Sequence, residues 1–154
     1  MIRFKTEARP SEIQGEGLFT LENISKRDIV WYFGYDDGDI IISEEEYLQK
    51  RITGDKIFQR TACRWIDDKF MYCENWGLDA YLNHSFDPNV LYYCGLGIAK
   101  RNILVGEEIT LNFQYMLSEK DTVKFLDKDS GNEVCGLSTQ EILLRTSKEL
   151  YELL

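Results

Sequence analysis

Proline and histidine are scarce in this chain, with two prolines and a single histidine among 154 residues. Long hydrophobic runs are also missing, since stretches such as Ile29–Phe33 and Ile40–Ile42 are far shorter than the ~20 apolar residues that cross a bilayer. The N-terminus, Met1–Lys5, lacks the apolar core of a secretory signal peptide. We therefore expect no membrane contact and a cytoplasmic or nuclear location.

Positive charge is under-represented as well. The chain has 27 acidic and 18 basic residues, which gives a formal net charge of −9. A surface that binds nucleic acid directly would carry clustered cations, so this balance argues against one. A negative field instead raises the encounter rate with a basic protein or peptide. The sequence does not indicate an oligomeric state.

The bulk composition is that of one folded domain. Apolar residues make up 44% and aromatic residues 13% of the chain, which is too much for a disordered protein. A chain of this length buries a core that needs neither disulfides nor a structural metal. The sequence therefore predicts one ordinary globular unit.

The four cysteines do not form a metal-binding pattern. They are Cys63, Cys73, Cys94 and Cys135, and no two of them stand in a Cys-x-x-Cys pair. With one histidine as a possible nitrogen ligand, we expect no metal site and interpret the cysteines as free thiols in a reducing compartment.

Short strands account for most of the predicted secondary structure. Bulky and β-branched residues predict strands over 17–20, 28–33, 90–94, 96–100 and 109–115. Arg60–Ile66 and Lys69–Cys73 form a predicted hairpin closed by Asp67 and Asp68, residues that tolerate tight turns.

Two helices are expected, each with a capping signal. Ser43-Glu44-Glu45-Glu46 is a capping box that begins a helical segment, and Gly54 ends it. Ser138-Thr139-Gln140-Glu141 begins a terminal helix over about 139–152, with apolar residues at helical spacing. The fold class is therefore mainly β with minor α.

Three segments contain most of the residues suited to chemistry. The first, Ile13–Phe19, has two glycines around Glu16, which allow the backbone to approach a ligand closely. The second, Tyr81–Asn89, packs Asn83, His84, Ser85 and Asn89 beside a proline. The third, 99–115, places a Gly106-Glu107-Glu108 turn before a strand that ends in aromatic residues.

Together and in this order, the three segments resemble the SET domain of protein-lysine methyltransferases. The resemblance covers about positions 10 to 116, and its most specific part is Asn-His-Ser-x-x-Pro-Asn followed downstream by Gly-Glu-Glu-Ile-Thr. It implies several short-stranded sheets around a C-terminal pseudoknot, in which 83–89 and 112–115 lie against each other. It also implies a SET domain at 1–116 with a helical insertion at about 43–60, and a C-terminal segment at 117–154 whose helix packs on the core.

The resemblance implies S-adenosyl-L-methionine as cofactor and the lysine ε-amine of a basic protein as substrate. The family's cofactor contacts map onto Glu16, Gly17, Asn83 and His84. Asn83 would hold the methionine part, and His84 would meet the adenine largely through its backbone.

The resemblance also implies a lysine channel with tyrosines. Tyr32 matches the family's Tyr-x-Gly element, and Tyr92 matches a channel tyrosine whose hydroxyl favours mono- or dimethylation. The family's usual catalytic tyrosine aligns with Phe113, which has no hydroxyl. Residues 113 and 115 share a face if the strand stays extended. We therefore expect Tyr115 to donate the hydroxyl and Phe113 to line the cofactor wall.

The chain also differs from many family members at a zinc-binding position, because Phe86 stands where those members have a cysteine. We expect Phe125, Leu126, Leu137 and the final helix to cover the adenine instead. Two alternatives stay open at this point: a catalytically impaired SET-like module that binds cofactor or a basic peptide, and a β-rich interaction domain without cofactor.

Overall fold

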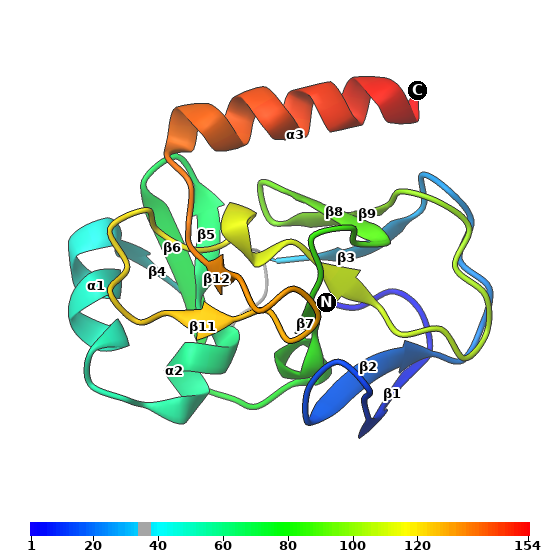
Figure 1. Cartoon of the computed structure of the whole chain (residues 1–154), viewed down its shortest axis with the longest axis horizontal. Coiled ribbons are helices and arrows are strands. Elements are labelled where there is room, and N and C mark those ends of the chain that lie inside the picture. The colour runs from blue at the N-terminus through cyan, green and yellow to red at the C-terminus, as the bar shows by residue number, and fades with distance from the viewer. Residues whose placement is uncertain (34–37) are drawn as a thin grey trace.

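Short strands dominate the architecture, as Figure 1 shows. The computed structural model describes residues 1–33 and 38–154. The strands are β1 (Thr6–Pro10), β2 (Glu16–Thr20), β3 (Ile29–Tyr32), β4 (Asp39–Ser43), β5 (Cys63–Ile66), β6 (Lys69–Cys73), β7 (Asn83–His84), β8 (Val90–Tyr93), β9 (Leu96–Ala99), β10 (Thr110–Leu111), β11 (Phe125–Leu126) and β12 (Glu133–Val134). The helices are α1 (Glu44–Arg51), α2 (Lys56–Thr61) and α3 (Thr139–Leu153), with short 3₁₀ turns η1 (Leu78–Tyr81) and η2 (Phe113–Tyr115). The prediction of a mainly β fold with few helices is confirmed.

The strands form several small sheets. Two are three-stranded and antiparallel, in the orders β3-β9-β8 and β4-β6-β5. The pairs β1-β2 and β11-β12 are antiparallel, and β10 pairs with β7 in parallel. The predicted hairpin of β5 and β6 is present, and Asp67 at its turn takes a φ of +50°.

Both predicted capping signals are found at helix starts. Ser43 accepts a hydrogen bond from the backbone of Glu46, whose side chain accepts one from the Ser43 backbone, so the capping box of α1 is complete. Ser138 accepts from the backbone N–H of Glu141 at the start of α3. These local bonds satisfy backbone donors that a helix start would otherwise leave unpaired.

Two predicted strand ranges were wrong. The strand expected over 109–115 ends at Leu111, because the Asn112 side chain accepts from the Gln114 backbone and caps a 3₁₀ turn. The strand expected from Arg60 begins at Cys63, because Asp55 caps a short helix that reaches Thr61.

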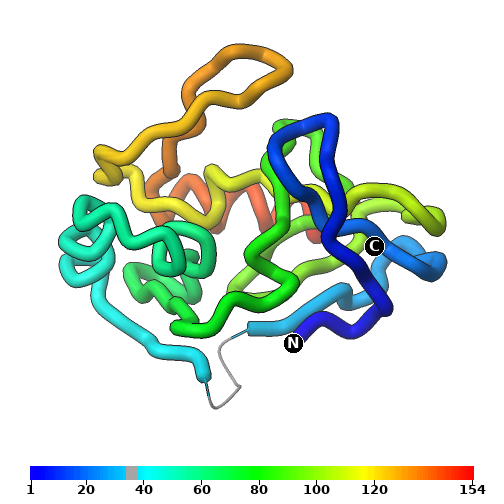
Figure 2. Tube along the Cα trace, turned by 90° about the horizontal axis from the view of Figure 1, so that it is seen from below, coloured from blue at the N-terminus to red at the C-terminus, as the bar shows by residue number. Residues whose placement is uncertain are grey.

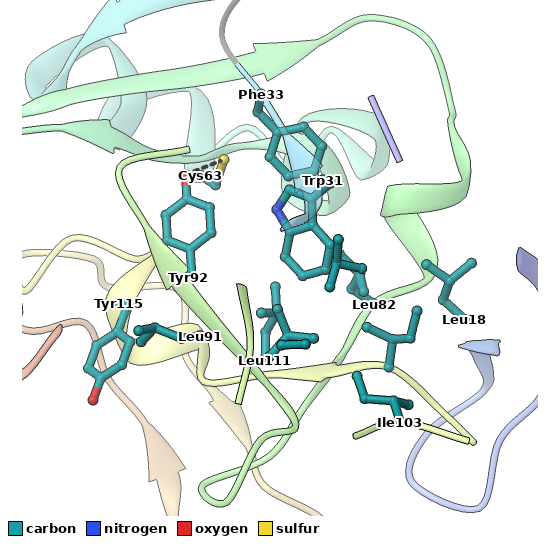
Figure 3. Close-up of a cluster of buried hydrophobic side chains, with 14 of the residues drawn as sticks. Leu18, Trp31, Phe33, Cys63, Leu82, Leu91, Tyr92, Ile103, Leu111 and Tyr115 are labelled. Carbon is teal, nitrogen blue, oxygen red and sulfur yellow. Dashed lines mark hydrogen bonds between the residues drawn. The ribbon is translucent and has the colours of Figure 1, made fainter. Parts of the chain in front are cut away.

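The main core lies between the β3-β9-β8 sheet and the segments packed on it. Figure 3 shows Trp31, Leu91 and Leu111 inside this cluster, and all three are nearly completely buried. Close packing depends on Gly97 of β9, where an added Cβ would lie 2.2 Å from the Trp31 ring. A second cluster under α1 stacks Tyr47 on Phe70 with ring centroids 4.0 Å apart.

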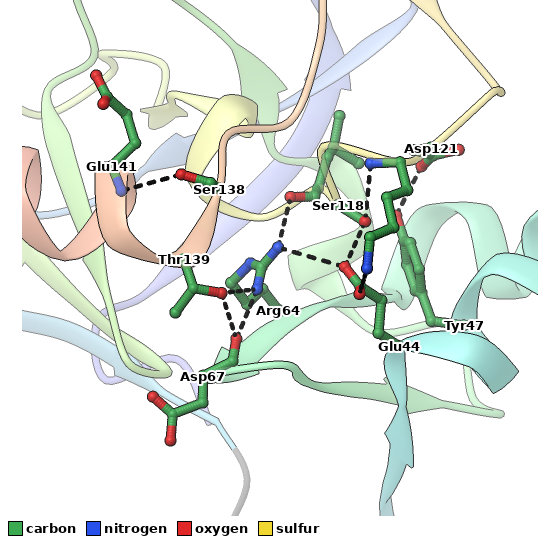
Figure 4. A network of polar contacts seen from close by, with 11 residues as sticks. Glu44, Tyr47, Arg64, Asp67, Ser118, Asp121, Ser138, Thr139 and Glu141 are labelled. Atoms are coloured by element: carbon green, nitrogen blue, oxygen red, sulfur yellow. Dashed lines mark hydrogen bonds and ion pairs between the residues drawn. The ribbon is translucent and has the colours of Figure 1, made fainter.

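Residues 117–121 attach the C-terminal part to α1 and β5 through the polar network in Figure 4. The Ser118 hydroxyl donates to Glu44, and Asp121 pairs with the buried Arg51 guanidinium at 2.8 Å. Arg64 donates to the Leu117 carbonyl and to the Thr139 hydroxyl at the start of α3. Breaking one partner of such a buried pair is costly, so this attachment fixes where the chain continues toward β11.

Segments 83–85 and 110–113 lie side by side although they are far apart in the sequence. Asn83 pairs with Thr110 and His84 with Leu111, and the Ser85 N–H donates to the Leu111 carbonyl at 2.8 Å. The expected contact of 83–89 with 112–115 is present through His84 and Phe113, whereas the strand pairing itself lies earlier, at Thr110 and Leu111. The threading that would make it a pseudoknot stays a prediction.

Candidate functional site

A large cavity of about 520 Å³ opens where several distant segments meet. We call it the large cavity. Its wall is formed by residues 13–14, the exposed side of α2, residues 83–84, residues 113 and 116–117, and residues 123–128. The corresponding elements α2, β7 and β11 lie on the same side of the molecule in the two views of Figure 1 and Figure 2.

Asn83 connects the loop before β2 to the cavity wall by hydrogen bonds. Its amide nitrogen lies 3.1 Å from the carbonyl oxygens of Gln14 and Glu16 and 2.8 Å from a carboxylate oxygen of Glu108. An amide has two N–H bonds, so these three acceptors share two protons. The loop before β2 is thereby held against β7.

Gly17 is needed because of a close approach. A Cβ at this position would lie 2.1 Å from the Glu108 carboxylate, which also accepts a hydrogen bond from the Ser11 hydroxyl. Sequence reasoning took Glu108 as part of a turn and missed this role. The Gly106-Glu107-Glu108 turn was the available signal, but the contact depends on tertiary packing. Neither Glu16 nor Gly17 lines the large cavity, and both act from behind it through Asn83 and Glu108.

His84 is buried to 94% and lines the large cavity. Its Nδ1 accepts the backbone N–H of Phe113 at 3.1 Å, and burial lowers the pKa of the imidazole, against a smaller opposing effect of Asp127. The ring is therefore neutral with its proton on Nε2. Among residues 1–33 and 38–154, this Nε2–H has no hydrogen-bond partner.

Phenylalanines surround the imidazole. Phe86 stacks edge-on at 4.5 Å between ring centroids, Phe113 lies at 5.6 Å, and Phe125 of β11 lies at 6.1 Å. Phe113 and Phe125 also line the large cavity, as does Leu126. Leu137 instead packs against the main core.

The charge of the cavity wall is opposite to that of the chain. Five basic side chains and one acidic side chain line it: Arg51, Lys56, Arg60, Lys124, Lys128 and Asp127. Arg51 and Lys124 are paired with acids, whereas Lys56 and Arg60 form no ion pair in the described part of the chain. The wall therefore presents free positive charge to a ligand.

A narrow pocket of about 40 Å³ adjoins the large cavity. It shares Arg60, Phe113 and Met116 with the large cavity, so these side chains separate the two spaces. Its remaining wall is mostly apolar and includes two carboxylates, Asp39 and Asp79.

The three tyrosines expected at a lysine channel lie elsewhere than on the large cavity or the narrow pocket. Tyr115 donates from its hydroxyl to Glu149 of α3 at 2.6 Å, because the 3₁₀ turn replaces the extended strand assumed for its placement. Tyr92 is 3% exposed and donates to the Arg64 carbonyl. Figure 3 shows these two hydroxyls pointing in different directions.

Tyr32 contacts the N-terminal residue, with its hydroxyl 3.5 Å from the Met1 sulfur. Its neighbour Phe33, and not Tyr32, lines the narrow pocket. Gly34, which completes the expected Tyr-x-Gly element, lies outside the described residues.

Two comparisons with known proteins bear on this arrangement. The family model described as SET domain matches residues 15–114, which include the Gly-x-Gly segment, Asn83, His84 and Glu108. The chain belongs to the SET-domain methyltransferase family. The histone-lysine N-methyltransferase set1 of Dictyostelium discoideum is 30% identical to this SET domain over 120 residues. That match covers 71% of this chain and 8% of the length of the relative.

No group of three or more His, Cys, Asp or Glu side chains arranged to hold a metal ion occurs among the residues the structure describes. Within the same ranges, no helix is both long and apolar enough to cross a bilayer. The four cysteines are free, and Cys63 is the most buried of them.

Proposed function

We propose that this SET domain transfers a methyl group from S-adenosylmethionine to the ε-amine of a lysine on a basic protein or peptide. The observation that supports it most is the Nε2–H of buried His84, which lies on the wall of the large cavity and has no partner among the described residues. Buried donors normally have acceptors, so this one fits a ligand with a ring nitrogen or carbonyl there. An adenine supplies such nitrogens, together with a flat apolar face for Phe113 and Phe125.

The charges on the wall fit the other end of this cofactor. Its methionine part ends in a carboxylate, and Lys56 and Arg60 of α2 are cations on the same wall that form no ion pair with any other described residue. Asn83 would orient the methionine part, while Glu16, Gly17 and Glu108 hold the Asn83 amide in place. These residues fit the group that the family uses.

Methyl transfer to lysine requires a neutral and correctly positioned amine. Free lysine has a pKa near ~10.4, so presenting its neutral form at pH ~7.4 costs roughly 4 kcal/mol. Burial of the ammonium among apolar side chains lowers that pKa. S-adenosylmethionine, when bound, supplies the methyl group and an adjacent positive charge. The protein then has to hold the attacking nitrogen in line, which is a positioning effect.

The catalytic roles expected of Tyr32, Tyr92 and Tyr115 stay predictions. In this structure their hydroxyls contact Met1, Arg64 and Glu149. The expected limit of mono- or dimethylation rests on Tyr92, and mass spectrometry of a labelled substrate would test it. A cytoplasmic or nuclear location is likewise a proposal.

Two measurements test the proposed function. Isothermal titration with S-adenosylhomocysteine should show binding, and His84→Ala should weaken it because the cavity loses its free donor. Incubation with methyl-labelled S-adenosylmethionine and a panel of basic proteins should label at least one of them. If the intact protein neither binds the first compound nor labels any protein, itself included, the proposed function is wrong.

A second candidate function follows from Phe113, which has no hydroxyl at the position of the family's tyrosine. The domain would then bind cofactor and a basic peptide without turnover. Binding of S-adenosylhomocysteine without transfer in the native protein, together with transfer by Phe113→Tyr, would select this alternative.

A further inference from the structure

The narrow pocket has the size and the wall for one cationic group. Its volume of about 40 Å³ exceeds the ~10–15 Å³ that a cavity needs to hold one water molecule, and an ammonium group is of similar size to water. Apolar side chains such as Phe33, Met71 and Leu82 form much of the wall and suit methylene groups. Phe113 and Met116 belong both to this wall and to the wall of the large cavity, so a group here is next to a ligand there.

Asp79 faces this pocket from η1, four residues before Asn83 in the chain. Gly77 leaves room for its carboxylate, since a Cβ at Gly77 would lie 2.4 Å from Asp79 Oδ1. In the described part of the chain, the Asp79 carboxylate forms no ion pair and bonds to its own backbone N–H. One short segment therefore positions both the Asn83 amide and the Asp79 carboxylate.

The charges around Asp79 favour a cation in the pocket. Burial raises the pKa of this carboxyl, the neighbouring charge of Asp39 raises it further, and the N-terminal ammonium of Met1 acts in the opposite direction. Arg60 lies at the boundary with the large cavity and forms no ion pair with Asp79 within the described residues. A carboxylate facing a partly desolvated space is stabilised by a cation placed next to it.

We propose that the narrow pocket takes the ε-ammonium end of the substrate lysine, and that the Asp79 carboxylate binds this ammonium and accepts its proton. The inference rests on the proposed function and names the residue that handles the substrate's charge. One N–H bond of the ammonium breaks and one O–H bond forms on Asp79. A neutral amine with its electron pair and a neutral carboxylic acid result, and no electron is gained or lost.

Binding of n-butylammonium, a mimic of the lysine side chain, tests the proposal in the full chain saturated with S-adenosylhomocysteine. NMR shifts of the Met71 and Leu82 methyl groups report on the pocket. The native protein should bind n-butylammonium and should bind the neutral n-butanol at least fivefold more weakly. Asp79→Asn, which keeps the shape and removes the charge, should abolish that preference, and Asp68→Asn in the exposed β5-β6 turn should preserve it.

Gly77→Ala provides a second variant should Asp79→Asn fail to fold. It keeps the acid but displaces the carboxylate, at a φ of −98° that alanine adopts without strain, so it should weaken n-butylammonium binding. The proposal is overturned if the native protein does not bind n-butylammonium, if n-butanol binds equally well, or if Asp79→Asn keeps the native preference.

The failure of the proposed function has a different signature. A native protein that does not bind S-adenosylhomocysteine, and labels no protein, would refute the methyl transfer. The amine titration can then be run without that compound and still reports on Asp79.

Discussion

Tyr115→Phe distinguishes a structural hydroxyl from a reacting one. The Tyr115 hydroxyl donates to Glu149 at 2.6 Å, and the other carboxylate oxygen of Glu149 pairs with Lys100 at 2.8 Å. Tyr115 is 5% exposed, so the bond links the 3₁₀ turn after β10 to the terminal helix.

The expected loss of unfolding free energy in Tyr115→Phe follows from the type of hydrogen bond that is removed. A hydrogen bond to a charged group contributes about 1.5–3 kcal/mol. The Glu149 side chain is 21% exposed and keeps Lys100, so water and the lysine compensate in part. We expect Tyr115→Phe to lower the free energy of unfolding by about 1.5 kcal/mol, at the lower end of that range.

Urea unfolding at pH 7.5 measures this loss, with Tyr151→Phe as control. Tyr151 lies on the same helix and is 79% exposed, so its hydroxyl should contribute less than about 0.5 kcal/mol. The double variant Tyr115→Phe/Glu149→Gln should show a coupling energy of about 1 kcal/mol between the two side chains.

Binding of S-adenosylhomocysteine should be unchanged in Tyr115→Phe, since Tyr115 does not line the large cavity. The structural explanation is refuted if the variant keeps the native free energy of unfolding and loses all methyl transfer. That result would place the Tyr115 hydroxyl in the reaction, as expected from its two-residue spacing to Phe113.

Three further perturbations test the cavity wall. His84 is the only histidine, and burial lowers its pKa in the folded state, so its stabilising effect is complete above about pH 6.5 and is lost as the pH falls through the folded-state value. His84→Gln should therefore flatten the fall in unfolding free energy between about pH 7.5 and 5.5, and an equally steep fall in the variant would contradict this. Gly17→Ala should lower the free energy of unfolding in urea by about 1–3 kcal/mol, because the added Cβ meets the Glu108 carboxylate. For the control Gly38→Ala the nearest atom lies 3.5 Å from the added Cβ, so the loss should be less than about 1 kcal/mol. Lys56→Glu should weaken S-adenosylhomocysteine binding about twofold to fivefold in calorimetry at low salt, and an effect that does not shrink at high salt would speak against a surface charge.

The elements with local signals were predictable from the sequence. The capping box at Ser43, the cap at Ser138 and the turn at Asp67 each depend on residues within four positions of one another. Asn112 carries a local signal too, but its cap competes with the strand propensity of the aromatic residues that follow it. The strand prediction for 109–115 failed at that point because the side chain–backbone bond prevailed.

The candidate site was predictable where a motif carried it and not where packing decided it. The proximity of Asn83 and His84 to the chain after Glu108 followed from the resemblance. The contact of Tyr115 with Glu149 did not, because it requires α3 to lie across the main core, and no short-range pattern encodes that position. The same holds for Lys56, which reaches the cavity wall only through the placement of α2.

Glu108 shows how a structural residue can control the site without lining it. Its carboxylate accepts from Asn83 and Ser11 and occupies the space that Gly17 leaves open. The Asn83 amide shares two protons among three acceptors, so loss of the carboxylate would let both protons bind the Gln14 and Glu16 carbonyl oxygens. The amide would keep its hydrogen bonds, but its position would be set by the loop before β2 alone. The carboxylate that follows the Gly106 turn therefore helps to fix the position of the Asn83 amide, which gives a physical reason for the Gly-Glu-Glu turn and the Asn-His segment to occur together.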